Sequence, residues 1–166
     1  MFVINSLGGG GAERVMATIL ANSRDRLAEH DFALAVLDDG PQAYPLPHWL
    51  KVFQLDCRGR TLSSIAAVDR LAGQFDPDLT VSFLTRANLA SALAMMKRRR
   101  PWIISERTST PAHLGSALRQ VATKVMMRFV YPRATGVIAV SNGVAGKLAR
   151  DFGVRTSSIE IIPNPV

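Results

Sequence analysis

The chain is poor in the residues from which several common sites are built. It has a single cysteine, Cys57, so it has no internal disulfide and no Cys/His spacing typical of zinc. No P-loop, GxSxG turn or HExxH pair occurs, which disfavours the hydrolases built on those motifs. Apolar runs stay short of the roughly 18 residues that a membrane-spanning helix requires. The apolar start at residues 1–7 lacks the charged segment of a signal peptide. We therefore expect a cytoplasmic protein, at most peripheral to a membrane, with no metal site.

The chain does contain a regular alternation of apolar runs and amphipathic segments. Its 166 residues, 48% of them hydrophobic, suit one compact domain. The pattern predicts strands at 1–5, 32–37, 52–55, 79–84, 102–105, 136–140 and 159–162. It predicts helices at 12–28, 62–75, 88–99, 114–130 and 143–152. Strands of consecutive apolar residues that alternate with helices are typical of a parallel sheet covered on both faces. We therefore predict a doubly wound α/β fold, a single Rossmann-like domain.

A run of four glycines, 8–11, separates the first strand from the first helix. Glycines at this place let a ligand approach the backbone, and the N-terminus of the following helix suits a diphosphate. The run matches only part of the GxGxxG dinucleotide fingerprint, but Asp38 or Asp39 could be the acidic residue that binds a ribose. An NAD(P)-binding domain of an oxidoreductase is therefore an alternative prediction. A flexible turn without a ligand is the simpler interpretation.

Polar residues follow two other predicted strands, at the edge where parallel strands of an open sheet face the ligand crevice. Arg86 and Asn88 follow the strand at 79–84, and Asn88 could instead be a helix N-cap. Glu106, Arg107 and Thr108 follow the strand at 102–105. Their charges and hydroxyl suit a sugar or a phosphate, although this segment could simply cap the next helix.

The net charge of +7 is unevenly placed. Residues 1–83 carry 7 Lys/Arg and 10 Asp/Glu, whereas residues 84–166 carry 13 and 3. This asymmetry indicates an anionic partner for the second half. The helix predicted at 114–130 has an apolar stripe and three further apolar residues outside it, Met126, Met127 and Val130. Apolar residues of this kind with flanking cations are typical of a helix at an anionic bilayer surface. A core helix with solvated cations is the alternative. The residues predicted to form this surface are Lys97, Arg98, Arg99, Arg100, Lys124 and Arg128.

Five short motifs, taken together and in this order, resemble the family-4 retaining glycosyltransferases of GT-B fold. They are LGGGGAERV at 7–15, VSFL at 81–84, ISER at 104–107, VSNGV at 140–144 and IPNPV at 162–166. The resemblance implies two Rossmann-like domains that face a cleft, of which residues 1–166 are the N-terminal, acceptor-binding one. The donor-binding domain would lie beyond Val166, so we expect this chain alone to be inactive.

The resemblance also implies where ligands lie. It places Gly9, Gly10 and Gly11 near the diphosphate of the donor, and Glu106 and Arg107 on the acceptor side. Many relatives have a histidine in the loop occupied here by Thr108–Thr110, so no catalytic residue is assigned. Transfer with retention needs no metal or cofactor beyond the nucleotide-sugar, which we expect to be a UDP-sugar.

The leading hypothesis is the acceptor-binding half of a glycosyltransferase that acts on a cell-envelope, lipid-linked glycan at the inner face of the membrane. An NAD(P)-binding domain is the second hypothesis. A basic module for nucleic acid is the third, but few aromatic residues accompany the cations and no nucleic-acid motif is present. An isolated half is also expected to self-associate through an apolar surface.

Overall fold

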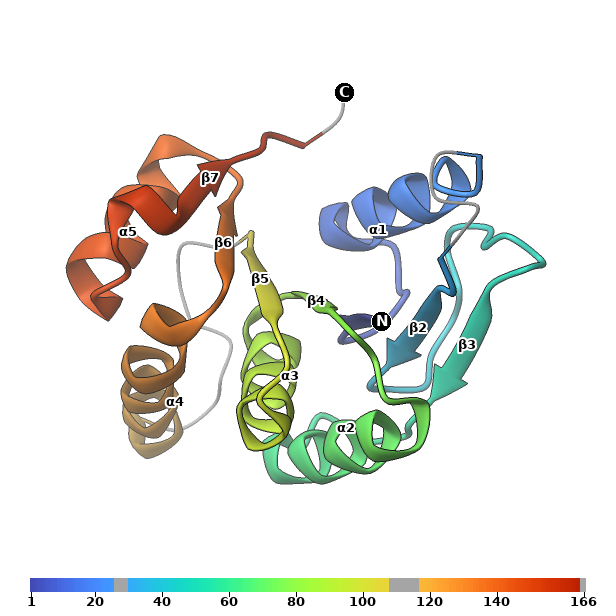
Figure 1. Ribbon diagram of the computed structural model, residues 1–166, viewed down its shortest axis with the longest axis horizontal. Coiled ribbons are helices and arrows are strands. Elements are labelled where there is room, and N and C mark those ends of the chain that lie inside the picture. The colour runs from blue at the N-terminus through green and yellow to red at the C-terminus, as the bar shows by residue number, and fades with distance from the viewer. Residues whose placement is uncertain (26–29, 108–116, 165–166) are drawn as a thin grey trace.

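Seven parallel strands form a single sheet in the computed structural model, which describes residues 1–25, 30–107 and 117–164. Their order across the sheet is β3-β2-β1-β4-β5-β6-β7 (Figure 1). The strands are β1 (Phe2–Ile4), β2 (Ala33–Val36), β3 (Lys51–Gln54), β4 (Thr80–Phe83), β5 (Trp102–Glu106), β6 (Gly136–Ala139) and β7 (Ile159–Ile161). The first six follow the order typical of doubly wound nucleotide-binding domains. The predicted fold class is confirmed.

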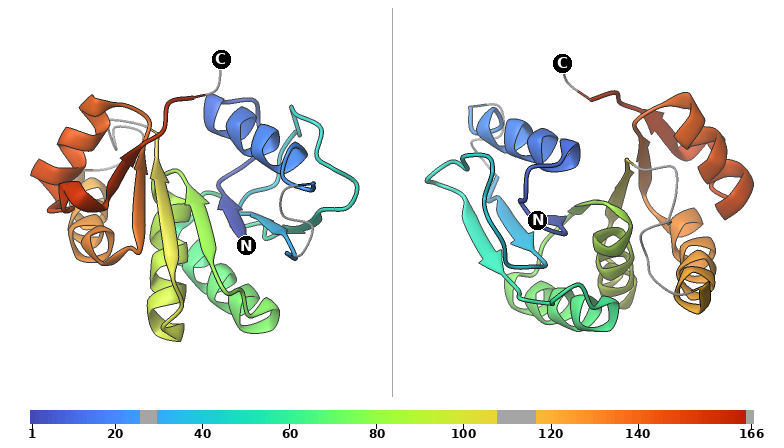
Figure 2. Two further views of the ribbon diagram at one scale, coloured as in Figure 1. Left: turned by 45° about the horizontal axis from the view of Figure 1, so that its top comes forward. Right: turned by 180° about the vertical axis from the view of Figure 1, so that it is seen from behind.

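Helices cover the two faces of the sheet unequally (Figures 1 and 2). The helix α1 (Gly11–Ala21) contributes to the apolar core on one face. The core on the other face includes residues of α2 (Thr61–Phe75), α3 (Thr85–Arg98), α4 (Ala117–Val130) and α5 (Asn142–Phe152). Two short 3-10 turns, η1 (Tyr131–Arg133) and η2 (Thr156–Ser158), complete the elements. No helix in the described ranges is long and apolar enough to cross a membrane.

The two cores explain why the strands are continuously apolar. Successive side chains of a strand point to opposite faces, so Val3 packs in the larger core and Ile4 in the smaller one. In β2, Ala35 and Val36 divide in the same way. Because both faces are buried, the inner strands are mostly apolar at every position, and the period-2 alternation of a half-exposed strand is absent.

The boundaries of two helices differ from the prediction. The structure ends α1 at Ala21, well before residue 28, although residues 26–29 lie outside the described part. The structure starts α3 at Thr85 with Leu84 as its N-cap, so the prediction that Asn88 is an N-cap is wrong. Leu84 has a φ of 75°, a value that turns the chain sharply from β4 into α3. The side chain of Asn5 supports this helix start by accepting a hydrogen bond from the Ala87 N–H at 3.1 Å.

Candidate functional site

The candidate site lies where the strand order reverses, between β1 and β4. In open α/β sheets, ligands bind in the crevice outside the carboxyl ends of the strands at such a switch point. The glycine run follows β1, and the sharp turn at Leu84 follows β4. The neighbouring strand β5 ends with Glu106 at the same edge. Three of the predicted polar or glycine-rich segments are therefore assembled at one edge of the sheet.

The glycine run forms an exposed loop that is tied to the segment before β3. The hydroxyl of Tyr44 donates a hydrogen bond to the carbonyl of Gly9 at 3.2 Å. Gly9 has a φ of +98°, and a Cβ there would lie 3.3 Å from that of Ala43, so this position strongly favours glycine. Gly10 is the N-cap of α1 and provides no side-chain cap. An uncapped helix N-terminus beside an exposed glycine loop suits a phosphate group.

Glu13 adds a carboxylate to this loop. Its side chain is 9% exposed and lies against Gly10, where a Cβ would collide with the carboxylate. Gly10 is therefore the residue that leaves room for Glu13. A carboxylate at the edge of a ligand crevice accepts hydrogen bonds from hydroxyl groups, such as those of a sugar.

Arg107 reaches the same crevice from the end of β5. Its guanidinium carbon lies 4.7 Å from the centre of the Phe83 ring, and its Nη1 donates a hydrogen bond to the side-chain oxygen of Asn164. The Asn164 amide nitrogen in turn lies 4.0 Å from the Cβ position of Gly11. Partial burial lowers the pKa of Arg107, although a guanidinium stays charged at neutral pH. The structure thus brings a cation, an amide and a helix N-terminus together.

Glu106 has a different environment from Arg107, its neighbour in sequence. It is 3% exposed and accepts hydrogen bonds from the Tyr131 hydroxyl at 2.8 Å, Thr85 Oγ1 at 3.2 Å and Asn88 Nδ2 at 3.4 Å. Burial and the negative charge of Glu106 raise the pKa of Tyr131 well above its usual value, so Tyr131 stays protonated as a donor. This buried network fixes the end of β5 against α3 and η1.

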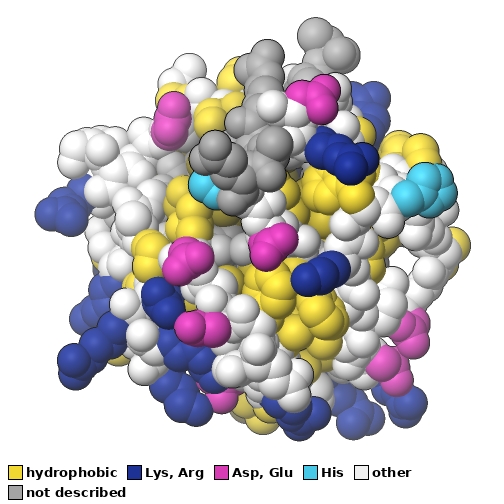
Figure 3. All heavy atoms as spheres, turned by 45° about the vertical axis from the view of Figure 1, so that its right-hand side comes forward, with side chains coloured by type: hydrophobic (Ala, Val, Ile, Leu, Met, Phe, Trp, Pro, Cys, Tyr) yellow, Lys and Arg dark blue, Asp and Glu magenta, His cyan; other side chains and the backbone are white. Residues whose placement is uncertain are grey.

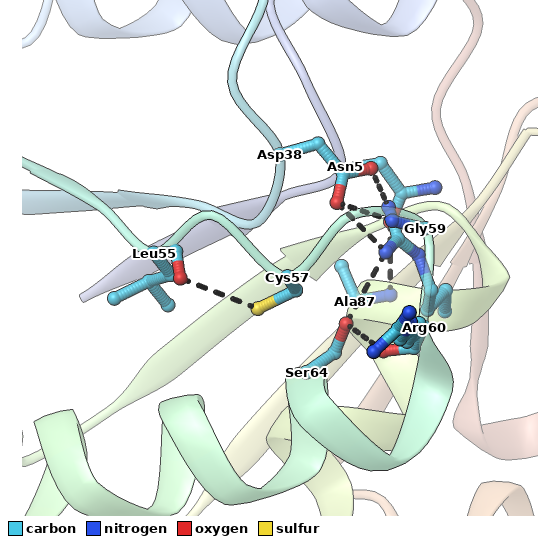
Figure 4. A network of polar contacts seen from close by, with 9 residues as sticks. Asn5, Asp38, Leu55, Cys57, Gly59, Arg60, Ser64 and Ala87 are labelled. Carbon is cyan, nitrogen blue, oxygen red and sulfur yellow. Dashed lines mark hydrogen bonds and ion pairs between the residues drawn. The ribbon is translucent and has the colours of Figure 1, made fainter.

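Arg86 is also buried, on the opposite side of the α3 start. It forms an ion pair with Asp38, and its Nη1 donates to Ser64 Oγ at 3.3 Å. Asp38 accepts a second hydrogen bond from the Gly59 N–H at 2.9 Å, so Asp38, Gly59 and Ser64 converge in the same place (Figure 4). Burial raises the pKa of Asp38, but the hydrogen bonds from Arg86 and Gly59 outweigh it, and the net pKa is lowered. Asp38, one of the two acids considered for a ribose, is thus bound within the domain.

The predicted basic surface divides into two parts. Lys97 and Arg98 both pair with Asp69, and Arg100 pairs with Asp76 at 2.9 Å. In contrast, Lys124 and Arg128 lie exposed on α4. The positive charge of the first group is therefore largely offset by neighbouring carboxylates, whereas the second group is exposed on α4.

Sequence reasoning found part of this site. Gly11 and Arg107 both lie next to Asn164, with Gly9 and Gly10 in the adjoining loop, whereas Arg86 and Asn88 are buried in α3. Thr108 lies outside the described residues. Sequence reasoning missed Glu13, Phe83 and Asn164 as site residues, although all three stand in the recognised motifs. For Phe83 and Asn164 the available signal was their position at or after the end of an apolar run.

An open parallel sheet with a glycine-rich turn, an uncapped helix start and a half-buried arginine at its switch point defines a Rossmann-like domain with groups suited to a phosphate. The chain belongs to the family of glycosyl transferase 4-like domains, which matches residues 10–165. The predicted membership of a GT4-like family is confirmed.

Similarity to individual proteins agrees with this family. The chain is 23% identical to an N-acetylgalactosamine-N,N'-diacetylbacillosaminyl-diphospho-undecaprenol 4-alpha-N-acetylgalactosaminyltransferase of Campylobacter jejuni, over 98% of this chain and 47% of that enzyme. It therefore spans about half the length of this curated relative.

Two solved structures share the fold. Anabaena Alr3699/HepE, in complex with UDP and glucose, superposes with a TM-score of 0.67 at 20% identity, over 99% of this chain and 44% of that one. The apo form of the lipopolysaccharide outer core galactosyltransferase WaaB superposes with a TM-score of 0.68 at 15% identity, over 99% and 45%. At these identities the likeness establishes the fold alone.

Proposed function

We propose that this chain is the acceptor-binding half of a retaining glycosyltransferase. The complete enzyme transfers a sugar from a UDP-sugar to a lipid-linked glycan of the cell envelope. Residues 1–166 form the N-terminal domain, and a second Rossmann-like domain supplies most of the donor site. The isolated chain is then inactive in transfer but competent to bind the acceptor.

The observation that carries this proposal is the meeting of Gly10–Gly11, Arg107 and Asn164 at the switch point. Backbone N–H groups at a helix start and a guanidinium both stabilise phosphate oxygens. The helix start at Gly10–Gly11 is suited to the negative charge of a departing nucleoside diphosphate. Arg107, on the acceptor side, is suited to the diphosphate of a polyprenyl-linked acceptor. The carboxylate of Glu13 is suited to hold a sugar hydroxyl, and buried Glu106 fixes the strand that carries Arg107. No side chain is assigned as catalytic.

The comparisons support the finer parts of the proposal. The Campylobacter relative is named for a diphospho-undecaprenol substrate, which supports a lipid-linked acceptor. The HepE structure contains UDP, which supports a uridine nucleotide as donor. A lipid-linked acceptor places the enzyme at the membrane surface, and we propose that it is peripheral on the cytoplasmic face.

The test is calorimetric titration of the chain with two kinds of ligand. The first is an acceptor analogue, a short-chain polyprenyl diphosphate that carries an N-acetylhexosamine. The second is a set of nucleotides: UDP-sugars, GDP-sugars and NAD(P). We expect binding of the polyprenyl-linked sugar, weak binding of UDP-sugars and none of NAD(P). Arg107→Gln is expected to weaken polyprenyl-linked sugar binding about tenfold, because a charge-assisted hydrogen bond to phosphate is lost. Arg70→Gln, an exposed substitution on α2, is the matched control.

Either of two results would contradict the proposal. Tight binding of NAD(P) would favour the oxidoreductase hypothesis, with Asp39 as the exposed acid after β2. Equal loss of binding in the Arg107 and Arg70 variants would show that the crevice is not the binding site.

A further inference from the structure

The helix α4 is apolar on two opposite faces. Met127 and Val130 are buried in the larger core. The residues Leu118, Val121, Val125 and Phe129 are instead exposed, at 79%, 58%, 61% and 51%. They recur every three or four residues, so they form one stripe along the helix. We name these four residues the α4 stripe. The structure thus places the stripe on the outside, and Met127 and Val130, which lie outside the stripe, in the core.

The segment of sequence that carries the α4 stripe has charge of one sign. Arg119, Lys124 and Arg128 are exposed on the same helix. Arg133 lies just beyond it, with its guanidinium carbon 4.1 Å from the centre of the Phe129 ring. No Asp or Glu occurs between Glu106 and Asp151 in the sequence. The helix therefore presents an exposed apolar stripe together with exposed cations. We call Arg119, Lys124, Arg128 and Arg133 the basic border.

The cluster at 97–100 differs from α4 in this respect. Three of its four cations are paired with carboxylates of Asp69, Asp76 or Asp78, which reduces the field that they project. In addition, none of the large apolar residues with exposed side chains lies in α3, the helix that carries Lys97 and Arg98. An anionic surface is therefore attracted more strongly to α4 than to residues 97–100.

We propose that α4 is a docking helix for an anionic phospholipid bilayer. The helix lies in the plane of the interface, its stripe enters the acyl boundary, and Arg119, Lys124, Arg128 and Arg133 contact lipid phosphates. This inference rests on the proposed function in one respect: a lipid-linked acceptor is the reason for the enzyme to be at a membrane. A second copy of the chain is a poorer occupant, because two α4 helices in contact would bring like charges together. Arginine and lysine, with their long apolar stems, are suited to an interface of this kind.

The experiment is co-sedimentation of the chain with vesicles of phosphatidylcholine, with and without phosphatidylglycerol. We expect binding to the anionic vesicles and little to the neutral ones. The double variant Leu118→Gln/Val125→Gln is expected to lower the partition coefficient about tenfold or more, because exposed side chains that would enter the bilayer become polar. Leu62→Gln is the matched control, since Leu62 is 80% exposed on a different helix, α2, and it should bind as the unmodified chain does.

The basic border is tested by charge. Lys124→Gln/Arg128→Gln is expected to lower binding to anionic vesicles by roughly fivefold for each cation removed. Lys97→Gln/Arg100→Gln should change it much less. The substituted side chains of α4 are exposed, so these variants are expected to fold, which circular dichroism checks.

Insertion itself is read from fluorescence. Phe129→Trp should shift its emission to shorter wavelength when anionic vesicles are added, and Leu62→Trp should not. The proposal is overturned if the chain does not bind anionic vesicles, or if the α4 and α2 variants lose binding equally. It is also overturned if the α4 stripe instead holds a dimer, seen by sedimentation velocity, that Leu118→Gln/Val125→Gln dissociates. None of these readouts requires donor, acceptor or transfer, so their failure leaves the test of the proposed function intact.

Discussion

At the scale of single residues, buried charges tie the loops of this domain to the start of α3. Arg86 is 8% exposed, and its guanidinium is held by Asp38 and Ser64, which follow β2 and begin α2. An arginine in this position links three segments that are far apart in sequence. Because a buried cation without its partner is costly, the pair makes the loop after β2 part of the folded core.

Replacing Asp38 is therefore expected to destabilise the domain. Asp38→Asn should lower the free energy of unfolding by about 2–3 kcal/mol, less than the loss of a fully buried pair, because the Asp38 side chain is 23% exposed. Urea denaturation at neutral pH measures the difference. The control is Asp56→Asn, whose ion pair with Arg58 is exposed and is therefore expected to contribute little to stability. Equal losses in the two variants would contradict this account.

The same pair predicts a pH dependence. The pKa of Asp38 in the folded chain lies below its usual 3.8, so its contribution to stability is fully present above that value. The contribution is lost as pH falls through the folded pKa, when Asp38 becomes protonated. The stability gap between the unmodified chain and Asp38→Asn should be constant near neutral pH and should narrow in acid below about pH 4. A gap that widened in acid would exclude the ion pair as its cause.

At the scale of elements, the sequence predicts the identity of each helix and strand better than their ends. All seven strands and five helices were expected, because consecutive apolar strands and amphipathic helices differ strongly in period. The start of α3 was not, since its support comes from Asn5, which is 82 residues away from Ala87, and from the φ of Leu84. The first signal is distant in sequence, and the second is a backbone conformation that a leucine rarely adopts. The exposure of the α4 stripe likewise depends on tertiary packing, because the sequence pattern of an apolar stripe is the same whether the stripe faces the core or the solvent.

The C-terminal end of α3 offers a direct test of helix capping. Arg99 is the C-cap residue, with a φ of 54°, and its side chain is exposed. A left-handed conformation costs an L-residue about 1 kcal/mol, which glycine avoids. Arg99→Gly is therefore expected to raise the free energy of unfolding by about 0.5–1 kcal/mol, after the greater entropy of the unfolded glycine is subtracted. Arg99→Ala should not raise it, and urea titration of both variants decides the point. If Arg99→Ala also raised the free energy of unfolding, the gain would come from loss of the arginine charge and not from the backbone conformation.

At the scale of the whole molecule, the acidic and basic halves of the sequence are folded into one sheet. Figure 3 shows one face, on which acidic side chains lie among the cations rather than in a separate patch. The site combines Gly11 at the start of α1, Arg107 directly after β5 and Asn164 after β7. Motifs indicated each piece, but the sequence could not show that they meet, because the order of strands in the sheet decides which ends are neighbours. Likewise, the pairing of Lys97, Arg98 and Arg100 with acids of the first half follows only from packing.

The order of the strands has a consequence for how the chain is made. β1 lies between β2 and β4, so the first three strands can form a partial sheet before β4 is synthesised. Thereafter β4 adds to the open edge of β1, and β5, β6 and β7 each add to the strand that precedes them in sequence. Only the β1–β4 pairing needs a long loop to close, and such a step is slow because of the chain entropy that it costs. Growth on the ribosome, at about 5–20 residues per second, can therefore follow the same order as growth of the sheet, with each new strand meeting an edge already in place.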